Sequence, residues 1–294
     1  MRIVSESEVR RCLSYDTLLP VLEWALIRLS SGQIRQPVRS VLAVPESHGL
    51  MGLMPAVDGD LMGLKVVTVY EKNGRLPTHQ AVIQLFRAAT GEPLAVMDGR
   101  LITEMRTAAV SAIAARTFSR DVPSVVAVLG SGVQARAHIE ALRRVREIRE
   151  IRIWSRTSEH AQRLAAECGG RACDVEEAVR GADIVFGVAN VSEPLIRGEW
   201  LGEETFVAAV GAIGPGKREL DDVAMQAPVV VESREAALRE SGDILATGAN
   251  IYAELGEVLA GSVAKPVSGR VVYKSLGVAA EDLAAARLVY ESLT

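Results

Sequence analysis

The stretch VVAVLGSGVQA at residues 125–135 decides the fold of this chain. Its first five residues are all apolar, as is typical of a strand buried on both faces of a parallel sheet. Gly130, Gly132 and Ala135 follow in the pattern G-x-G-x-x-G/A. In that pattern the first glycine makes a tight turn from strand to helix, the second lets a pyrophosphate approach the backbone, and a small third residue lets the helix pack on the strand. We therefore predict that Gly130 opens the dinucleotide site of a Rossmann domain.

From residue 123 onward, predicted strands and helices alternate, which is the pattern of a parallel sheet covered by helices on both faces. The apolar runs expected to form strands are residues 124–129, 150–154, 183–188, 206–210 and 228–232. Helices fit between them at residues 133–146, 158–168, 174–180 and 219–226. The predicted fold class is therefore α/β, with a doubly wound parallel sheet of the Rossmann type at residues 119–271.

The first 118 residues mix helices and strands and are expected to form a separate α+β domain. Helical periodicity runs over residues 9–30, and short strands at 40–44 and 61–70 are separated by turns rich in proline and glycine. A hairpin is expected over residues 82–98. The next helix is expected over residues 103–118, where Thr103 can cap it and Glu104 complements its dipole.

Composition and charge exclude several classes of protein. The 294 residues are 49% hydrophobic and carry a net charge of -4 with both signs mixed, unlike the basic stripe of a nucleic-acid binder. The three cysteines cannot all pair, which favours reduced thiols, and the four histidines lack the spacing of metal ligands. No apolar run reaches membrane-spanning length, and the N-terminus lacks the apolar core of a signal peptide. We expect a cytoplasmic globular protein without a metal, nucleic-acid or membrane partner.

The end of the second predicted Rossmann strand bears on the choice of cofactor. NAD-specific proteins usually place Asp or Glu there to bind the ribose hydroxyls. This chain instead has Ser155, Arg156 and Thr157, so no carboxylate repels a 2′-phosphate and an arginine between two hydroxyls can bind one. We therefore expect NADPH as the preferred cofactor. The alternative is that Arg156 is a surface arginine that stacks on adenine, which leaves NADH possible.

Cations in apolar surroundings mark a candidate substrate site in the first domain. Arg106 lies in the first turn of the helix expected at residues 103–118, and a guanidinium beside a helix N-terminus is a good carboxylate receptor. Lys65 is a lone charge in an apolar strand; buried lysines are rare unless paired, and their pKa shifts easily, which suits acid–base catalysis. The alternative is that Lys65 is exposed on a strand edge. Arg39 is a weaker candidate on its own.

Short motifs along nearly the whole chain carry a resemblance to a known family. They are MPA at residues 54–56, GLKVV at 63–67, LPT at 76–78, TGEPLA at 90–95, IT at 102–103, RTAA at 106–109, GSGVQA at 130–135, ADIV at 182–185, ELGEV at 254–258 and KSLG at 274–277. With these motifs the chain resembles the ornithine cyclodeaminase/mu-crystallin family. The resemblance implies that the first domain binds substrate and forms a homodimer, and that a C-terminal segment of about residues 272–294 returns to it.

The resemblance also implies roles for individual residues. Arg39, Lys65 and Arg106 are expected to surround the carboxylate of an imino or amino acid, with Lys65 as proton donor or relay. Leu276 is expected beside the substrate. The expected cofactor-binding residues are Thr78, Gly130, Gly132, Val133, Gln134, Ser155, Arg156, Thr157, Ala189, Gly211, Lys217 and Ser275. The stretch at 155–157 is similar to that of NADPH-binding members and differs from ornithine cyclodeaminases, which place an acidic residue there.

One departure from the family bears on the reaction. Cyclodeaminases carry a catalytic aspartate just after the Val-Gly that here ends the strand expected at residues 206–210, whereas Ile213 occupies that place in this chain. Deamination of ornithine requires a base, which isoleucine cannot provide. Reduction of a preformed imine requires only that the protein hold the carboxylate, protonate the nitrogen and orient the cofactor. We therefore expect NAD(P)H-dependent reduction of a cyclic imino acid such as pyrroline- or piperideine-2-carboxylate.

Three alternatives stay open at this point. They are an ornithine cyclodeaminase, an amino-acid dehydrogenase that uses free ammonia, and a non-catalytic crystallin-like binding protein. A cyclodeaminase would require an acidic residue elsewhere, such as Asp58, Asp60 or Glu71, to reach the substrate amine. The presence of both Lys65 and Arg106 speaks against a non-catalytic protein.

Overall fold

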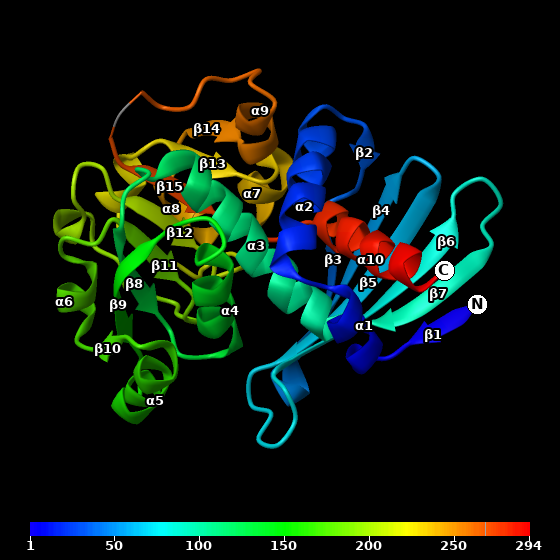
Figure 1. Cartoon of the computed structure of the whole chain (residues 1–294), viewed down its shortest axis with the longest axis horizontal. Coiled ribbons are helices and arrows are strands. Elements are labelled where there is room, and N and C mark those ends of the chain that lie inside the picture. The colour runs from blue at the N-terminus through cyan, green and yellow to red at the C-terminus, as the bar shows by residue number, and fades with distance from the viewer. Residues whose placement is uncertain (268) are drawn as a thin grey trace. The chain divides into compact units, whose positions relative to one another are not determined.

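The computed structural model describes residues 1–267 and 269–294, which divide into two compact units (Figure 1). Unit 1 contains Met1–Arg106 together with Gly277–Thr294, and unit 2 contains Thr107–Leu276. The division falls inside helix α3 (Arg100–Phe118). The C-terminal segment Gly277–Thr294 thus belongs to the same unit as the N-terminal segment Met1–Arg106.

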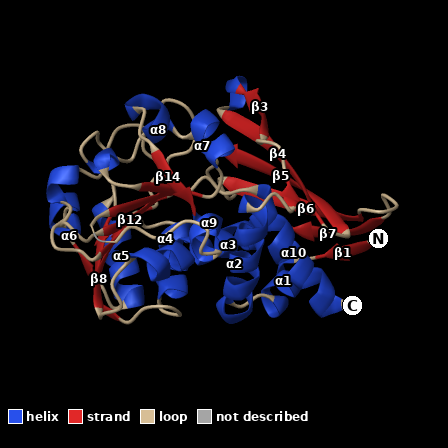
Figure 2. Cartoon of the chain, turned by 90° about the horizontal axis from the view of Figure 1, so that it is seen from above, coloured by secondary structure: helices blue, strands red, loops and turns tan. Residues whose placement is uncertain are grey.

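Unit 1 is built on a mainly antiparallel sheet. Its strand order is β1-β7-β6-β5-β4-β2, and β3 also pairs with β4. The strands are β1 (Arg2–Val4), β2 (Ile34–Arg35), β3 (Ser40–Val44), β4 (Gly49–Asp58), β5 (Leu61–Tyr70), β6 (His79–Arg87) and β7 (Pro93–Asp98), with the short helix η1 (Pro45–Ser47) after β3. The helices are α1 (Glu6–Cys12), α2 (Tyr15–Ser30) and α10 (Ala279–Leu293). Helix α10 packs on α2 and lies on one face of the sheet, over β4, β5 and β6 (Figure 2).

Strand β5 shows how this packing positions a charged residue. Along β5 every second residue from Leu61 to Val67 is buried, and Lys65 is one of them. Gly63 lies directly beneath α10, because a Cβ added there would be 2.9 Å from the Leu283 side chain. Successive side chains of a strand point to opposite faces, so Lys65 shares the face of Gly63 under α10. The alternative of an exposed strand-edge lysine is therefore wrong.

Two sequence predictions for the first half of unit 1 need correction. Residues 9–30 form parts of two helices instead of one, because the Ser14 side chain accepts a hydrogen bond from the Thr17 N–H and begins α2. Residues 49–58, expected to lie in turns, form strand β4. Pro55 is tolerated in it because the edge of β4 opposite β5 is open there, between the residues that pair with β3 and those that pair with β2.

The start of helix α3 also differs from the prediction. The helix begins at Arg100, whose N–H donates to the Asp98 carboxylate at 3.0 Å. Thr103 is therefore not the cap, and its hydroxyl donates instead to the Gly99 carbonyl at 2.7 Å. Arg106 consequently lies in the second turn of α3 and not in the first.

Unit 2 contains the predicted parallel sheet and confirms the α/β fold class. Its strand order is β10-β9-β8-β11-β12-β15-β13-β14. The strands are β8 (Ser124–Leu129), β9 (Ile148–Trp154), β10 (Arg171–Ala172), β11 (Ile184–Gly187), β12 (Phe206–Ala209), β13 (Val229–Val231), β14 (Ile251–Glu254) and β15 (Val271–Lys274). The helices are α4 (Val133–Leu142), α5 (Ser158–Cys168), α6 (Val175–Val179), α7 (Arg234–Glu240), α8 (Gly242–Thr247) and α9 (Leu255–Leu259), with short 3₁₀ turns η2 (Gly198–Trp200) and η3 (Ala224–Gln226).

The chain reverses its direction of travel across the sheet at β8. Strands β9 and β10 follow on one side of β8, and β11 and β12 follow on the other. Ligands of such sheets bind at this switch point, outside the carboxyl ends of the strands.

Among the described residues, no helix is both long and apolar enough to cross a bilayer.

The segment after β12 differs from the prediction of a helix at residues 219–226. Only η3 is helical there. The N–H groups of Glu219 and Leu220 donate to the Asp243 carboxylate, and the Glu219 carbonyl accepts from Ile196, so these groups are not available for a helix. Strand β15, which the sequence did not indicate, is inserted between β12 and β13.

Candidate functional site

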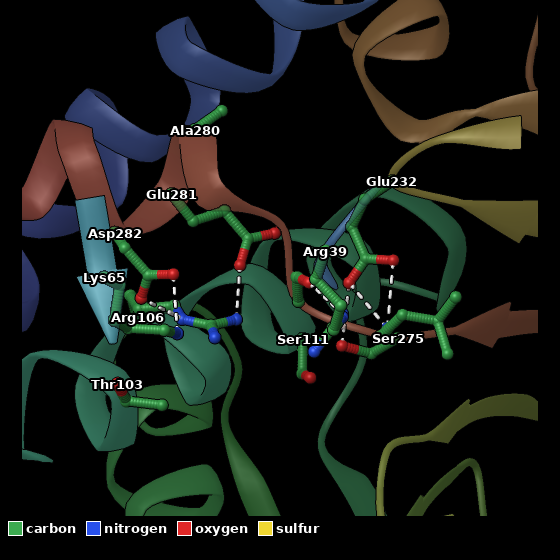
Figure 3. Close-up of polar contacts among 12 residues, drawn as sticks. Arg39, Lys65, Thr103, Arg106, Ser111, Glu232, Ser275, Ala280, Glu281 and Asp282 are labelled. Carbon is green, nitrogen blue, oxygen red and sulfur yellow. Dashed lines mark hydrogen bonds and ion pairs between the residues drawn. The ribbon is translucent and has the colours of Figure 1, made fainter. Parts of the chain in front are cut away.

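A buried ion-pair network in unit 1 joins two of the residues expected to bind substrate (Figure 3). The Asp282 carboxylate of α10 lies 2.6 Å from Lys65 Nζ and 3.0 Å from Arg106 Nε. Glu281, the preceding residue, lies 2.5 Å from Arg106 Nη1. Lys65 is 2% exposed and Arg106 is 4% exposed. Two carboxylates at the start of α10 thus balance two cations contributed by β5 and α3.

Gly277 brings the third expected residue, Arg39, to the same group. The Arg39 guanidinium donates to the Gly277 carbonyl at 2.7 Å. A Cβ added to Gly277 would be 2.2 Å from Arg106 Nη1, and its φ of +69° lies in the left-handed region. Glycine is therefore required here by both space and conformation. Gly277 thus contacts both arginines, and the structure brings Arg39, Lys65 and Arg106 together.

The electrostatics of this group favour a titratable lysine. Burial lowers the pKa of Lys65 to about 8, with Asp282 acting to raise it and Arg106 and Arg39 acting to lower it. For Asp282, burial acts to raise the pKa, but Arg106 and Lys65 outweigh it and the pKa is lowered. Burial, Lys65 and Arg106 together lower the pKa of His79 to about 4, so this neighbouring imidazole is neutral near pH 7. A cationic lysine beside two arginines can bind a carboxylate and give up a proton.

Sequence reasoning missed Glu281 and Asp282. The signal that could have found them is an acidic pair in the first turn of an otherwise alanine- and leucine-rich helix, where both carboxyls are buried. Buried carboxylates require cationic partners, and the buried cations Lys65 and Arg106 require anionic partners. Their separation in the chain hides the pairing, which spans 176 residues between Arg106 and Asp282.

The expected cofactor residues of unit 2 gather at one edge of its sheet. They follow the carboxyl ends of the neighbouring strands β9, β8, β11, β12 and β15. In that strand order they are Ser155, Arg156 and Thr157; Gly130, Gly132, Val133 and Gln134; Ala189; Gly211 and Lys217; and Ser275. Thr78 lies in unit 1, on the loop between β5 and β6, and its role stays a prediction.

The glycine turn after β8 fits a dinucleotide. Gly130 has a φ of +143°, and a Cβ there would be 2.9 Å from Val188. Gly132 begins α4, and a Cβ there would meet nothing within 4 Å, so the space above its backbone is open. Within the described residues, no side chain caps α4. Its first N–H groups are thus available to bind a pyrophosphate.

The strands on either side of β8 complete this edge. The Ser155 hydroxyl lies 2.8 Å from that of Ser131, which places the end of β9 beside the glycine turn, and Arg156 is exposed there. On the other side Gly211 meets Ala189 so closely that a Cβ would be 2.1 Å from the Ala189 carbonyl oxygen. Lys217 Nζ donates to the Asn190 side chain at 2.9 Å.

Ser275 and Leu276 share a buried carboxylate partner. The Ser275 hydroxyl donates to Glu232 at 2.8 Å, and the Leu276 N–H donates to both Glu232 oxygens at 3.1 Å (Figure 3). Glu232 therefore holds the two residues that follow β15. The residues that the structure describes contain no group of three or more His, Cys, Asp or Glu side chains that could hold a metal ion.

Comparison with known proteins identifies the family. A model of the ornithine cyclodeaminase/mu-crystallin family matches residues 1–294. The chain belongs to this family. Ketimine reductase mu-crystallin of Mus musculus is 46% identical over 301 residues, which cover 98% of this chain and 96% of that protein.

Two solved structures of related enzymes are also similar. Δ1-pyrroline-2-carboxylate reductase of Thermococcus litoralis, in complex with NADH and L-proline, has a TM-score of 0.92 at 31% identity and covers 99% of this chain and 97% of its own. An archaeal alanine dehydrogenase dimer with bound NAD has a TM-score of 0.93 at 31% identity, covering 99% and 95%. The expectation of a nicotinamide-dependent oxidoreductase of the ornithine cyclodeaminase/mu-crystallin family is confirmed.

The position at which cyclodeaminases of this family carry an aspartate lies at the cofactor edge of unit 2. Ile213 is 40% exposed, on the segment that follows β12. Two of the acidic residues considered as replacements are engaged elsewhere in unit 1, because Asp58 pairs with Arg28 and Asp60 with Arg287. Glu71 is exposed on the loop after β5. The acidic residues that accompany Lys65 and Arg106 are instead Asp282 and Glu281.

Proposed function

We propose that this enzyme reduces a cyclic imino acid, such as pyrroline- or piperideine-2-carboxylate, with NADPH as the preferred cofactor. The observation that carries the proposal is the buried Lys65 ammonium beside Arg106, joined to it by the Asp282 carboxylate. Arg39 and Arg106 bind the substrate carboxylate, and Lys65 Nζ gives a proton to the ring nitrogen. NADPH, when bound, supplies the hydride to the imine carbon. Proton and hydride together convert the C=N bond into a secondary amine.

The pKa of about 8 suits Lys65 to this task. At neutral pH the side chain is protonated and can donate, and its acidity is greater than that of a solvent-exposed lysine. Asp282 favours the charged form, whereas Arg106 and Arg39 make proton release easier. After donation a neutral Lys65 regains its proton from solvent, so each turnover consumes one proton.

Ile213 favours reduction over deamination. An isoleucine on the segment after β12 cannot act as a base toward a substrate amine. Asp282 does not take over that role in our proposal, because its two oxygens already lie against Lys65 and Arg106. The alkyl side chain suits a substrate that enters as a ring with its imine already formed.

The preference for NADPH rests on the end of β9. Arg156 is exposed beside the glycine turn, between Ser155 and Thr157, and can pair with a 2′-phosphate. The T. litoralis reductase and the archaeal alanine dehydrogenase carry NADH and NAD in their structures. For this chain NADH remains the second choice, since a surface arginine can also stack on adenine.

The open face of the unit 1 sheet supports a homodimer. Helix α10 covers one face, whereas Leu42, Met51, Leu53 and Val82 on the other face are each between 36% and 66% exposed. Leu53 pairs with Val66, which in turn pairs with Val82, so apolar side chains run across three strands. Apolar patches of this kind usually bind another protein, and a second copy of this face is our proposed occupant.

We place the enzyme in the cytoplasm, because its three cysteines are free thiols.

A cofactor-consumption assay tests the proposed reaction. Pyrroline-2-carboxylate, piperideine-2-carboxylate and ornithine are offered separately, the imines with NADPH or NADH and ornithine with NAD. We expect oxidation of NADPH with at least one of the cyclic imines and no release of ammonia from ornithine. Release of ammonia from ornithine without net reduction of NAD would instead support a cyclodeaminase.

A further inference from the structure

Unit 2 buries a second cluster of charged side chains that the proposed reaction does not use. Lys274 ends β15, Glu219 lies on the segment after β12, and Asp243 lies in the first turn of α8; each is at most 1% exposed. Lys274 Nζ lies 3.1 Å from Glu219 Oε2 and 3.0 Å from Asp243 Oδ2, and it donates to the Ala212 carbonyl at 2.8 Å. Buried charges of this kind add little net stability compared with apolar packing, so another role accounts for them better.

The two carboxylates hold main-chain N–H groups at both ends of one segment. Glu219 Oε1 accepts from the Gly211 N–H at 3.0 Å. Asp243 Oδ1 accepts from the N–H groups of Glu219 at 2.9 Å and Leu220 at 3.0 Å. Residues 211–220, which include Ile213 and Lys217, are therefore tied at their start and at their end. Lys274 joins both ties and adds a third at Ala212.

Three glycines leave this arrangement little freedom. A Cβ at Gly211 would be 2.1 Å from the Ala189 carbonyl oxygen, and a Cβ at Gly242 would be 2.1 Å from the Lys217 carbonyl oxygen. A Cβ at Gly187 would be 2.8 Å from Glu219 Oε1. The segment thus packs backbone against backbone on β11 and α8. A shift of either carboxylate would break hydrogen bonds to this segment.

The two carboxyl groups stabilise the charge of Lys274. For Lys274, burial acts to lower the pKa, but Glu219 and Asp243 outweigh it and the pKa is raised. Burial raises the pKa of Glu219, and Lys274 opposes that change. The lysine is therefore a permanent cation between two carboxyl groups.

We propose that Lys274, Glu219 and Asp243 are positioning residues that hold residues 211–220 at the cofactor edge and so set the affinity for the nicotinamide cofactor. They act through Gly211, Lys217 and the neighbouring Ser275, and not by touching the cofactor. The inference rests on the proposed function, because it takes Gly211, Lys217 and Ser275 as cofactor-binding residues, as the family resemblance implies. In this proposal, cofactor affinity depends on three buried residues outside the glycine turn as well as on the turn itself.

Two substitutions of Glu219 separate positioning from mere stability. Glu219→Gln keeps a side-chain oxygen for the Gly211 N–H, whereas Glu219→Leu leaves that N–H only the Gly187 carbonyl, 3.1 Å away. We expect Glu219→Leu to raise the Kd and the KM for the cofactor about tenfold or more, and Glu219→Gln to stay within about threefold of the wild type. Cofactor affinity is measured by nicotinamide fluorescence at a temperature at which circular dichroism shows every variant folded. Glu176→Leu, which removes an exposed carboxylate paired with Arg180, is the matched control.

The outcomes distinguish this inference from the proposed function. A folded Glu219→Leu variant whose Kd and KM for the cofactor equal those of the wild type would overturn the positioning role. If that variant still reduces the imine, the proposed function is unaffected. A wild-type enzyme that binds and oxidises no cofactor would overturn the proposed function itself. If Glu219→Leu does not fold, the double variant Lys274→Met/Glu219→Gln is used, because it keeps both N–H acceptors and removes the tie to Ala212. An unchanged cofactor KM in that folded double variant would likewise overturn the inference.

Discussion

The Asp282 carboxylate lies 2.6 Å from the Lys65 ammonium, and both side chains are 2% exposed. The same carboxylate lies 3.0 Å from Arg106 Nε, and Glu281 provides a second anion for that guanidinium. Such a lysine has a lowered pKa of about 8 yet is charged at neutral pH. The pairing explains how an apolar sheet can carry a proton donor.

Loss of the lysine should affect turnover more than cofactor binding. In Lys65→Ala the proton donor is gone, and we expect kcat to fall about 100-fold or more. The Kd for NADPH should change little, because the glycine turn belongs to unit 2. Steady-state kinetics and fluorescence titration measure the two quantities, with Lys72→Ala, an exposed lysine, as control. Unchanged turnover would remove Lys65 from the mechanism.

The pH profile should report the Lys65–Asp282 pair. Donation requires the protonated amine, so kcat/KM should decrease as the pH rises through about 8, the pKa of Lys65. Asp282 acts to raise that pKa, so Asp282→Asn should move the alkaline limb to lower pH by about one pH unit or more. Glu281→Gln, which alters a carboxylate paired with Arg106, is the control and should move the limb less. A limb that stays in place in Asp282→Asn would rule out the coupling.

Cofactor preference should depend on Arg156. Arg156→Ala removes the proposed partner of the 2′-phosphate, and a hydrogen bond to a charged group at an exposed site is worth about tenfold in binding. We therefore expect the KM for NADPH to rise about tenfold and the KM for NADH to stay nearly constant. Both values come from initial rates with one saturating imine. Equal changes for the two cofactors would contradict the assignment to the 2′-phosphate.

A substitution of Gly132 should affect cofactor binding without affecting folding. A Cβ at Gly132 would meet nothing within 4 Å of the protein, so Gly132→Ala should keep the melting temperature of the wild type. The same methyl group would occupy the space through which a pyrophosphate approaches the backbone, so cofactor binding should weaken about tenfold or more. Gly74→Ala, at another glycine with open space around it, is the control for both readouts. Tight cofactor binding by Gly132→Ala would place the pyrophosphate elsewhere.

Local features of the sequence predicted the Rossmann part well. The apolar run before Gly130 forms β8 as expected, because its strand period, its glycine turn and its helix signals all agree. The prediction for α3 was less accurate because Asp98, which ends β7, also binds the first N–H of the helix. Arg106 was therefore assigned to the wrong turn, although its chemical environment was anticipated.

Contacts between distant segments were not predictable from one sequence. Asp282 and Glu281 meet Arg106 only because α10 packs over the sheet of unit 1. In the sequence, two acidic residues at the start of a helix are already explained by the helix dipole, so they do not indicate a buried partner. Likewise, the residues around Glu219 have a helical composition, and the competing hydrogen bonds from Asp243 depend on where α8 lies. Tertiary hydrogen bonds overrode local preference in both places.

The most direct test of the central claim follows the hydride. Pyrroline-2-carboxylate is reduced with NADPH that carries deuterium at the transferred position of the nicotinamide, and the product is analysed by mass spectrometry and NMR. We expect proline with one deuterium at the α-carbon and oxidation of one cofactor for each proline formed. Proline without deuterium, or a folded enzyme that oxidises no cofactor with any cyclic imino acid, would contradict it.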